Sequence, residues 1–212
     1  MPEKTKQCCL LGYAGHGLVV AEAAMLLKMN LIAYADKSAL THNPYNLSYW
    51  GDEASMEFKG WAEEAVFILG IGNNLIRSKV GNYIRSKGFS CLSLIHPASS
   101  VSSFSEIGEG TFVARNAAIN PFCKIGMDVI INTSASIDHE CTIGAGSHIA
   151  PGAVLAGNVT VGEQAFIGAN AVIKQGVKIE NGAVVGAGSV VIKDVAQNKL
   201  VIGNPAKESN ER

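Results

Sequence analysis

The sequence has few aromatic residues and prolines, almost no excess of charge and no long apolar run. Aromatics make up 7% of the 212 residues, there are 6 prolines, and the formal net charge is −1. Such a balance gives no electrostatic reason to bind nucleic acid or an anionic membrane. The polar start MPEKTKQ has no signal-peptide core, and no apolar stretch reaches bilayer-spanning length. We therefore expect a globular protein that binds neither nucleic acid nor membrane.

The cysteines are also too few and too scattered for a disulfide framework. There are 5 of them, and an odd number favours a reduced, cytoplasmic protein. Cys123 and Cys141 are spaced so that they fall on equivalent inward positions of the repeat described next, where they would pack as small apolar side chains. An inward-facing Cys141 is expected to be a poor nucleophile.

What the sequence does contain is a period of six that holds from residue 107 to residue 195. Every sixth residue is branched aliphatic, and the fourth residue after each is no larger than valine. Two inward positions in six are typical of a hexapeptide-repeat parallel β-helix, and an α-helix cannot stay in phase with this period. The fifteen aliphatic positions are Ile107, Val113, Ile119, Ile125, Ile131, Ile137, Ile143, Ile149, Leu155, Val161, Ile167, Ile173, Ile179, Val185 and Val191.

The third residue after each aliphatic position predicts the corners. Eleven of the fifteen are Gly, Asn or Asp, which tolerate the positive φ of a tight corner. The exceptions are Phe122, Ser134, Glu140 and Gln164. Because three of them fall between residues 122 and 140, and exceptions to local rules often mark function, we look for the chemistry there.

The residues before the repeat predict a nucleotide-binding domain. A buried strand, Gln7 to Leu11, leads into a glycine turn, Gly12 to Gly17, and then into an apolar helix, Leu18 to Met29. A second strand, Leu31 to Ala35, ends at Asp36. This order is that of a Rossmann-type site, in which helix amides hold phosphate and the carboxylate holds ribose or base. A tight turn without a ligand is the alternative.

The rest of this domain is short. We expect a loop with at most one short helix over residues 37–60, a strand from Ala65 to Ile71, a helix ending near Lys87 and a strand from Phe89 to Ile95. About four strands fit a mononucleotide or nucleotide sugar better than a dinucleotide. Ile95 and Val101 already follow the six-residue register, so the tube is expected to begin near His96, with the preceding domain covering its end. The predicted domains are residues 1–95 and 96–212.

Several segments together resemble a known enzyme family. They are Gly12…Gly15-His16-Gly17, Gly72-Asn73-Asn74…Arg77, Leu94-Ile95-His96 and Asn132-Thr133-Ser134…His139-Glu140-Cys141…Ile143-Gly144. They are similar to the hexapeptide-repeat nucleotide-sugar acetyltransferases of bacillosamine synthesis, and the sialic-acid O-acetyltransferases share much of this layout. The resemblance implies a Rossmann-like domain followed by an all-β left-handed parallel β-helix, use of acetyl-CoA without a metal, and a homotrimer with active sites between subunits.

The same resemblance implies site residues. His139 would be the general base, because a neutral imidazole accepts a proton, and Glu140 would orient it; Asn132 matches a further active-site position. Gly157 lies eighteen residues after His139, directly above it if the coils stay in register, and leaves room for a thioester. The predicted acetyl-CoA contacts are His148, Gly157, Ala169, Ala187 and Lys207. The predicted nucleotide-sugar contacts are Gly15, His16, Gly17, Asp36, Asn73 and Asn74.

The function this predicts is acetyl transfer from acetyl-CoA to the 4-amino group of a UDP-linked amino-dideoxy sugar, by direct attack. O-acetylation of a sugar such as sialic acid is the nearest alternative. A dinucleotide-dependent oxidoreductase would leave the tube without a role, and a pure scaffold has no need of His139 and Glu140. A zinc enzyme of the carbonic anhydrase type needs three ligands, whereas His139 and His148 are half a coil apart.

Overall fold

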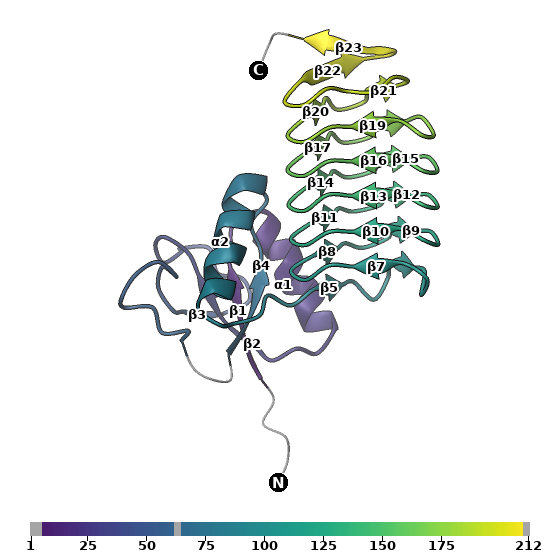
Figure 1. Cartoon of the computed structure of the whole chain (residues 1–212). Helices are drawn as coiled ribbons and strands as arrows, with labels where there is room; N and C mark the ends of the chain where they lie inside the picture. The colour runs from purple at the N-terminus through teal and green to yellow at the C-terminus, as the bar shows by residue number, and fades with distance from the viewer. Residues whose placement is uncertain (1–5, 62–64, 210–212) are drawn as a thin grey trace.

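The computed structural model describes residues 6–61 and 65–209, so most of the polar start at residues 1–7 lies outside the described residues. The chain folds into a small α/β domain beside a tall three-sided tube of short strands (Figure 1). No helix in the described ranges is both long and apolar enough to cross a bilayer.

The amino-terminal domain is a parallel sheet of four strands in the order β3-β2-β1-β4. Alternate residues of β1 enter different cores: Cys8 and Leu10 pack on the side of α1, and Leu11 packs on the side of α2. The two helices therefore cover opposite faces of the sheet, as in a doubly wound fold. The elements are β1 (Gln7–Leu11), α1 (His16–Leu26), β2 (Leu31–Ala35), β3 (Ser48–Tyr49), β4 (Ala65–Leu69) and α2 (Asn74–Ser86).

The predicted order of elements is confirmed here, but some bounds are wrong. The helix expected at Leu18–Met29 is α1, which begins two residues earlier, at His16, and ends at Leu26. The strand expected at Phe89–Ile95 is reduced to β5 (Leu94–Ile95) and one isolated bridge from Cys91 to Phe67. These residues cross from the sheet to the tube, so they cannot pair along one partner. The stretch 37–60, expected to be a loop with at most one short helix, contains β3 and no helix.

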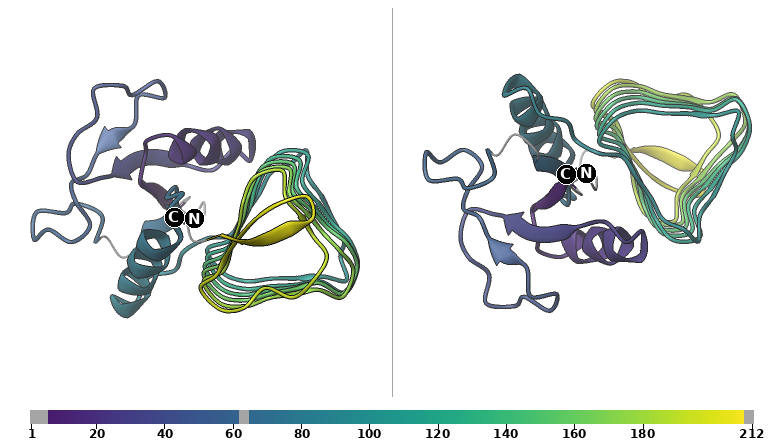
Figure 2. Two further views of the ribbon diagram at one scale, coloured as in Figure 1. Left: turned by 90° about the horizontal axis from the view of Figure 1, so that it is seen from above. Right: turned by 90° about the horizontal axis from the view of Figure 1, so that it is seen from below.

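The tube is a left-handed parallel β-helix with a triangular cross-section (Figure 2). Each strand pairs with the strand eighteen residues away, as Lys124 does with Thr142, and the strands form three sheets, each named here by its first strand. The β5 sheet contains β5, β8 (Phe112–Val113), β11 (Ile130–Ile131), β14 (His148–Ile149), β17 (Phe166–Ile167), β20 (Val184–Val185), β22 (Leu200–Gly203) and the antiparallel β23 (Ala206–Ser209). The β6 sheet contains β6 (Ser100–Val101), β9 (Ala118–Ile119), β12 (Ser136–Ile137), β15 (Val154–Leu155), β18 (Val172–Ile173) and β21 (Val190–Val191). The β7 sheet contains β7 (Glu106–Ile107), β10 (Lys124–Ile125), β13 (Thr142–Ile143), β16 (Thr160–Val161) and β19 (Lys178–Ile179).

The six-residue pattern is confirmed in the tube. Every aliphatic position from Val113 to Val191 is buried, and Ile107, at the lower end, is half-buried against the same core. Every predicted corner position except Asp194 has a positive φ, including the exceptions Phe122, Ser134, Glu140 and Gln164. The strands follow one another without a long insertion from residue 107 to residue 191. The last coil is two residues shorter, since Val195 pairs with Ile179.

The expectation that the amino-terminal domain covers the end of the tube is wrong. Seen along the tube axis, the domain lies beside the triangle (Figure 2). It packs there because Leu94, Phe112 and Ile130 of the β5 sheet point outward and join the core of Leu10 and Tyr13. The lower end of the tube is instead a hollow of about 460 Å³, lined in part by the first apolar positions of the repeat.

Three columns of corners run along the tube. The His139 edge joins the β6 sheet to the β7 sheet, and the Ala169 edge joins the β5 sheet to the β6 sheet. The third, the Gln164 edge, joins the β7 sheet to the β5 sheet and lies against α2, because Gln164 Nε2 donates to Ser78 Oγ at 2.7 Å. The corner exception at Gln164 is thus explained by domain docking.

Candidate functional site

A hollow of about 270 Å³ lies where β1, β2 and β4 end, lined by Gly12, Ala14, Asp36, Gly70 and Gly72 among others. Ligands bind at this edge of open parallel sheets, where the strand order reverses. A Cβ atom on Gly17 would lie 2.2 Å from the carbonyl oxygen of Gly12, so the close approach of α1 to β1 requires glycine. Asp36 borders the hollow and accepts hydrogen bonds from the N–H groups of Tyr13 at 3.3 Å and Lys37 at 2.8 Å.

The residues of the predicted phosphate-binding turn face two different parts of the molecule. Gly15 precedes α1 as its N-cap, with φ 51 and no side chain over the helix terminus. The imidazole of His16 instead lies between the domains, with its ring centre 5.4 Å from that of Phe112 and 6.2 Å from that of His148. The turn can therefore offer helix amides to phosphate while His16 faces the tube.

Asn73 and Asn74 have structural partners in this chain. Asn73 caps α2 by accepting a hydrogen bond from the N–H of Ile76 at 3.0 Å. Asn74 Nδ2 donates to the carbonyl oxygens of Gln164 at 3.3 Å and Ala165 at 3.0 Å on the tube. Neither is among the residues that line the hollow, so their contact with substrate stays a prediction.

Arg77 is a residue to which the sequence analysis gave no role. Its side chain is 1% exposed and donates on one side to the carbonyl oxygens of Ile71 and Gly72, both at 3.1 Å. On the other it donates to those of Asp128 at 2.7 Å and Gly146 at 2.8 Å. Arg77 thus joins the wall of the hollow to two corners of the tube. The signal was present in the sequence, because Arg77 shares the apolar face of its helix with Val80 and Ile84.

Asn132 and His148 form a pair on the β5 sheet, next to His16. Asn132 Oδ1 accepts the N–H of Thr133 at 2.8 Å, so its Nδ2 is the atom that donates to His148 Nε2 at 3.0 Å. Burial, followed by the nearby Arg77, lowers the pKa of His148 to about 4. Burial, then His148, lowers the pKa of His16 to about 4 as well. Both imidazoles are therefore neutral at physiological pH. His16 Nε2 and His148 Nδ1 are buried without a hydrogen bond of good geometry, although the backbone of Gly72 acts on His148 and partly opposes the lowering of its pKa.

His139 and Glu140 form a second pair on the His139 edge. His139 Nδ1 lies 3.0 Å from Glu140 Oε2. An ionised carboxylate only accepts hydrogen bonds, so in the neutral imidazole Nδ1 carries the proton and Nε2 keeps its lone pair. Asp138 Oδ1 fixes the corner by accepting from the N–H of His139 at 2.8 Å and from Asn120 Nδ2 at 2.8 Å. The bond from Asn120 holds the pKa of Asp138 below its ordinary value.

Gly157 lies directly above this imidazole, as the count of eighteen predicts. A Cβ atom on Gly157 would be 2.5 Å from both Cε1 and Nε2 of His139, so the ring rests against backbone that has no side chain. The arrangement leaves a free basic nitrogen beside an open strip of main chain. It can accept a proton from a nucleophile that attacks a carbonyl group placed there.

The remaining predicted acetyl-CoA contacts lie elsewhere in the chain. Ala169 and Ala187 stack on the Ala169 edge, across the β6 sheet from His139, and Lys207 is in β23. One chain alone does not bring these residues together with His139. Cys141, next to the catalytic candidates in sequence, is wholly buried, and burial raises its pKa to about 11; the expected inward packing is confirmed.

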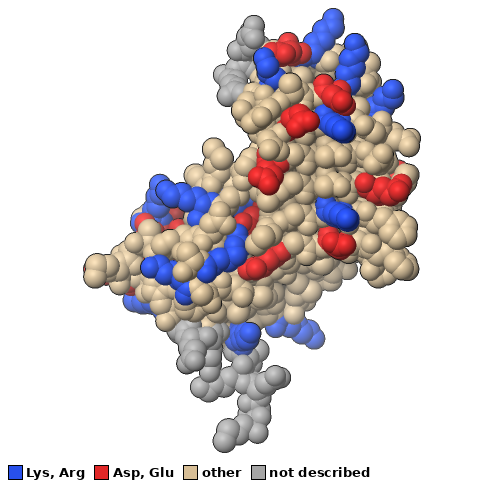
Figure 3. Space-filling view, in the orientation of Figure 1, with Lys and Arg blue, Asp and Glu red and all other residues tan. Residues whose placement is uncertain are grey.

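A cluster of metal ligands or a surface patch of one charge would point to other functions. Within residues 6–61 and 65–209, no three His, Cys, Asp or Glu side chains converge as metal ligands would. On the face drawn in Figure 3, basic and acidic side chains are interspersed over the upper coils.

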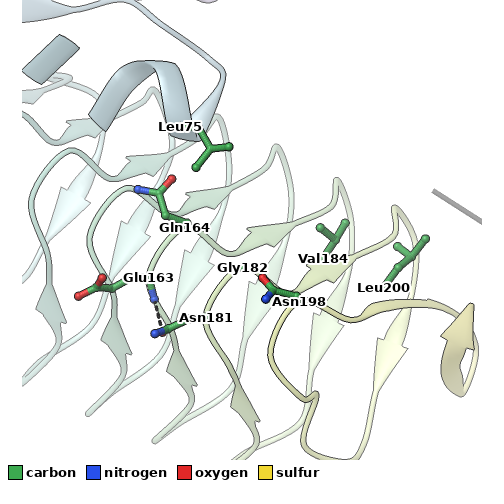
Figure 4. A pocket seen from close by; sticks show the side chains of 8 residues that line it. All are labelled: Leu75, Glu163, Gln164, Asn181, Gly182, Val184, Asn198 and Leu200. Atoms are coloured by element: carbon green, nitrogen blue, oxygen red, sulfur yellow. Dashed lines mark hydrogen bonds between the residues drawn. The ribbon is translucent and has the colours of Figure 1, made fainter. Parts of the chain in front are cut away.

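A groove of about 720 Å³ also runs up the Gln164 edge above α2 (Figure 4). Its lining is Leu75, Glu163, Gln164, Asn181, Gly182, Val184, Asn198 and Leu200. None of these is a predicted site residue, and the groove lies on a different edge from His139.

Comparisons with known proteins match both parts of the chain. Residues 7–84 match the family described as PglD N-terminal domain, residues 122–157 match bacterial transferase hexapeptide (six repeats), and residues 158–193 match hexapeptide repeat of succinyl-transferase. A curated relative, UDP-N-acetylbacillosamine N-acetyltransferase of Bacillus subtilis (strain 168), is 31% identical over 110 residues. That match spans 51% of this chain and 51% of the relative, about half the length of each.

Solved structures match over nearly the whole chain. The acetyltransferase domain of PglB from Neisseria gonorrhoeae FA1090 is 33% identical with a TM-score of 0.91, covering 96% of this chain and 100% of that one; it has also been solved with acetyl coenzyme A. A mutant of perosamine N-acetyltransferase from Caulobacter crescentus, solved with CoA and GDP-perosamine, is 36% identical with a TM-score of 0.91 over 97% of each chain.

Proposed function

Because the chain belongs to the hexapeptide-repeat sugar acetyltransferases, we propose that it transfers an acetyl group from acetyl-CoA to the amino group of a nucleotide-linked amino sugar. The finer proposal is the 4-amino group of a UDP-linked amino-dideoxy sugar. The observation that carries the proposed acetyl transfer is the His139–Glu140 pair, 3.0 Å apart, with the free Nε2 against Gly157. Buried free thiols at all five cysteines fit a cytoplasmic enzyme.

In the proposed reaction His139 acts as a general base. The amine nitrogen attacks the thioester carbonyl carbon while His139 Nε2 takes the amine proton. The N–C bond forms, the C–S bond breaks, and the imidazolium returns its proton to the sulfur of CoA. The backbone N–H of Gly157 would donate to the oxyanion of the tetrahedral intermediate, and Glu140 would stabilise the imidazolium.

The nucleotide would occupy the hollow at the ends of β1, β2 and β4. Its phosphates would lie at the terminus of α1 near Gly15 and Gly17, and Asp36 would accept from the ribose or the base. His16 and His148 support this placement of the sugar, because each has a buried nitrogen without a partner next to the turn. A hydroxyl-bearing substrate would satisfy these nitrogens.

We further propose a homotrimer in which the three copies meet through their β6 sheets around an axis parallel to the tubes. The outward residues of the β6 sheet are apolar or small, whereas those of the β7 sheet are polar or charged and exposed. For the β6 sheet they are Ser100, Ala118, Ser136, Val154, Val172 and Val190, and for the β7 sheet Glu106, Lys124, Thr142, Thr160 and Lys178. An apolar stripe beside a polar one favours association through the first.

This assembly would complete the site. The His139 edge and the Ala169 edge are the two borders of the β6 sheet, so each copy would set its His139 edge against the Ala169 edge of the next, on which Ala169 and Ala187 lie higher than His139. A rotation about an axis parallel to the tube keeps each residue at its own height. His139 would therefore face the neighbouring corner that follows Asn132, which lies in the same coil.

The test is release of free thiol from acetyl-CoA with a panel of acceptors. The panel contains UDP-linked and GDP-linked 4-amino sugars and sialic acid. We expect turnover with a nucleotide-linked amino sugar and the highest kcat/KM with the UDP form. Preference for the GDP form, which the relative solved with GDP-perosamine favours, would change only the nucleobase in the proposed substrate. Turnover only with sialic acid would make the protein an O-acetyltransferase, and no turnover with any acceptor would overturn the proposal.

A further inference from the structure

Two aromatic side chains are exposed on the His139 edge, in the coils just below the catalytic pair. Phe104 is 70% exposed and Phe122 is 64% exposed, and their ring centres lie 5.9 Å apart. Phe122 occupies the corner one coil below Glu140, since the N–H of Glu140 donates to the carbonyl oxygen of Pro121 at 3.1 Å. The aromatic pair therefore extends the column of His139 toward the lower end of the tube.

Phe122 has a backbone conformation that costs free energy in the isolated chain. Its φ is 63, a conformation that disfavours bulky residues, and Asn116 and Asn158 occupy equivalent corners at φ 58 and φ 56. The ring gains little burial in return, and an apolar pair left in water reduces solubility. Since neither folding nor solubility explains this residue, a partner is expected to cover it.

A matching apolar surface lies on the opposite border of the β6 sheet. On α1, Val19 is 40% exposed and Leu26 is 50% exposed, on the same stripe as Glu22. Glu22 Oε2 pairs with Arg115 at 3.2 Å, and Arg115 is in the corner between β8 and β9. This contact fixes the apolar stripe of α1 beside the Ala169 edge. The chain thus has an apolar patch at each border of the one sheet.

We infer that the Phe104–Phe122 pair docks on α1 and Arg115 of a second copy of this chain, and that the contact sets the register of His139 against the neighbouring pocket. The inference rests on the proposed trimer. Phe122 and Arg115 belong to the same coil, so an axis parallel to the tube brings them to the same height. The guanidinium of Arg115 can then lie on an aromatic face, while Val19 and Leu26 cover the other ring. His139, one coil higher, would be held beside the neighbour's Asn132.

The test replaces both rings without straining the fold. Phe104→Ser/Phe122→Asn removes the aromatic pair. Asparagine suits position 122, because Asn116 and Asn158 occupy the equivalent turn position in other corners with a similar positive φ. Met56→Ser/Leu75→Ser is the matched control, because it removes two exposed apolar side chains away from the β6 sheet; Met56 is 102% exposed and Leu75 is 71% exposed. Oligomeric state is measured by sedimentation over a range of protein concentrations, with Tm and acetyl transfer measured on the same samples.

We expect the aromatic variant to keep or raise its Tm when both chains are measured at concentrations at which they are dissociated, since assembly itself raises Tm. It should dissociate at protein concentrations about tenfold or more above those at which the native chain does, and its kcat should fall as it dissociates. The control should assemble as the native chain does. Leu26→Lys on α1 should weaken assembly in the same way, because it alters the other side of the same contact. A variant that stays assembled with full activity overturns the inference, as does one that stays assembled and only raises KM for the sugar, which would make the rings a substrate contact. If the native chain assembles through these residues but transfers no acetyl group, the docking stands and the proposed function fails.

Discussion

The imidazole of His139 lies against Gly157, the residue eighteen positions further along the chain. A single added carbon at Gly157 would come within 2.5 Å of the Nε2 atom. The space around the free Nε2 atom of the proposed base therefore depends on the absence of a side chain at Gly157. This contact is the first to test.

Gly157→Ala is expected to lower kcat about 10- to 100-fold, because displacement of a catalytic group by about 1 Å can reduce a rate by that much. The backbone of Gly157 does not have a positive φ, so alanine should be accepted by the main chain. Steady-state kinetics together with Tm check this. A normal kcat with a normal Tm would show that the ring position is not critical.

His139→Ala should lose roughly 10²- to 10⁴-fold in kcat, the usual range for a general base. The KM values should change much less, since the base acts mainly in the transition state. Glu140→Asn should lose less, because the imidazole remains, and asparagine accepts the positive φ that Glu140 has.

Cys141→Ser is the companion measurement for this mechanism. The thiol is buried and its pKa is raised to about 11 by burial, so the variant should keep most of its activity. A stable acetyl adduct on Cys141, seen by mass spectrometry, would contradict direct transfer. A near-normal rate in the His139 variant would contradict the role of His139 as the general base.

Asp36→Ala should raise KM for the nucleotide sugar about tenfold and leave KM for acetyl-CoA nearly unchanged. The reason is that Asp36 borders only the hollow of the amino-terminal domain. Asp36→Asn is the matched variant, because it keeps one oxygen that can accept from the N–H of Lys37, while it loses the charge and the second acceptor, which the N–H of Tyr13 uses. Equal changes in both KM values would point to a general loss of structure.

Mixing two variants tests whether the site is shared between copies. His139→Ala and Asp36→Ala are co-refolded in equal amounts and assayed at a sugar concentration well below the KM of the Asp36 variant. A closed ring with one site at each interface restores an intact pair at about one quarter of the interfaces, so activity should exceed the sum of the two parents. Activity no greater than that sum would place the whole site within one chain.

Stability should fall as the pH drops from 6.5 toward 4. Burial lowers the pKa of His16 and His148 from the ordinary value of 6.5 to about 4, so the unfolded chain binds more protons in this window. Their contribution is fully present above pH 6.5 and is lost as the pH falls to about 4, with a size of about 3 kcal/mol for each.

The measurement is the free energy of unfolding against pH for His148→Phe. Its slope between pH 4 and 6.5 should be shallower than that of the native chain. His42→Phe, at an exposed loop position, is the control and should keep the native slope. An unchanged slope in the His148 variant would show that protonation of this side chain is not coupled to folding.

The sequence by itself determined the tube. Aliphatic residues such as Ile137 and corner residues such as Asn158 encode burial and positive φ locally, and each coil repeats the rule of the one below. The position of Gly157 over His139 followed from counting, because a tube with eighteen residues per coil has only one register. The strand, turn and helix around Gly17 were determined in the same local way.

Only the tertiary structure decided what lies between the domains. The approach of His16 to His148, the hydrogen bonds of Asn74 and Arg77 to the tube, and the docking of Gln164 on α2 join residues separated by many coils or by a whole domain. No period in the sequence encodes such contacts, because they depend on which face of the tube the sheet packs against. That face was set by Phe112 and Ile130, apolar side chains that point outward from a strand whose inward positions were already filled.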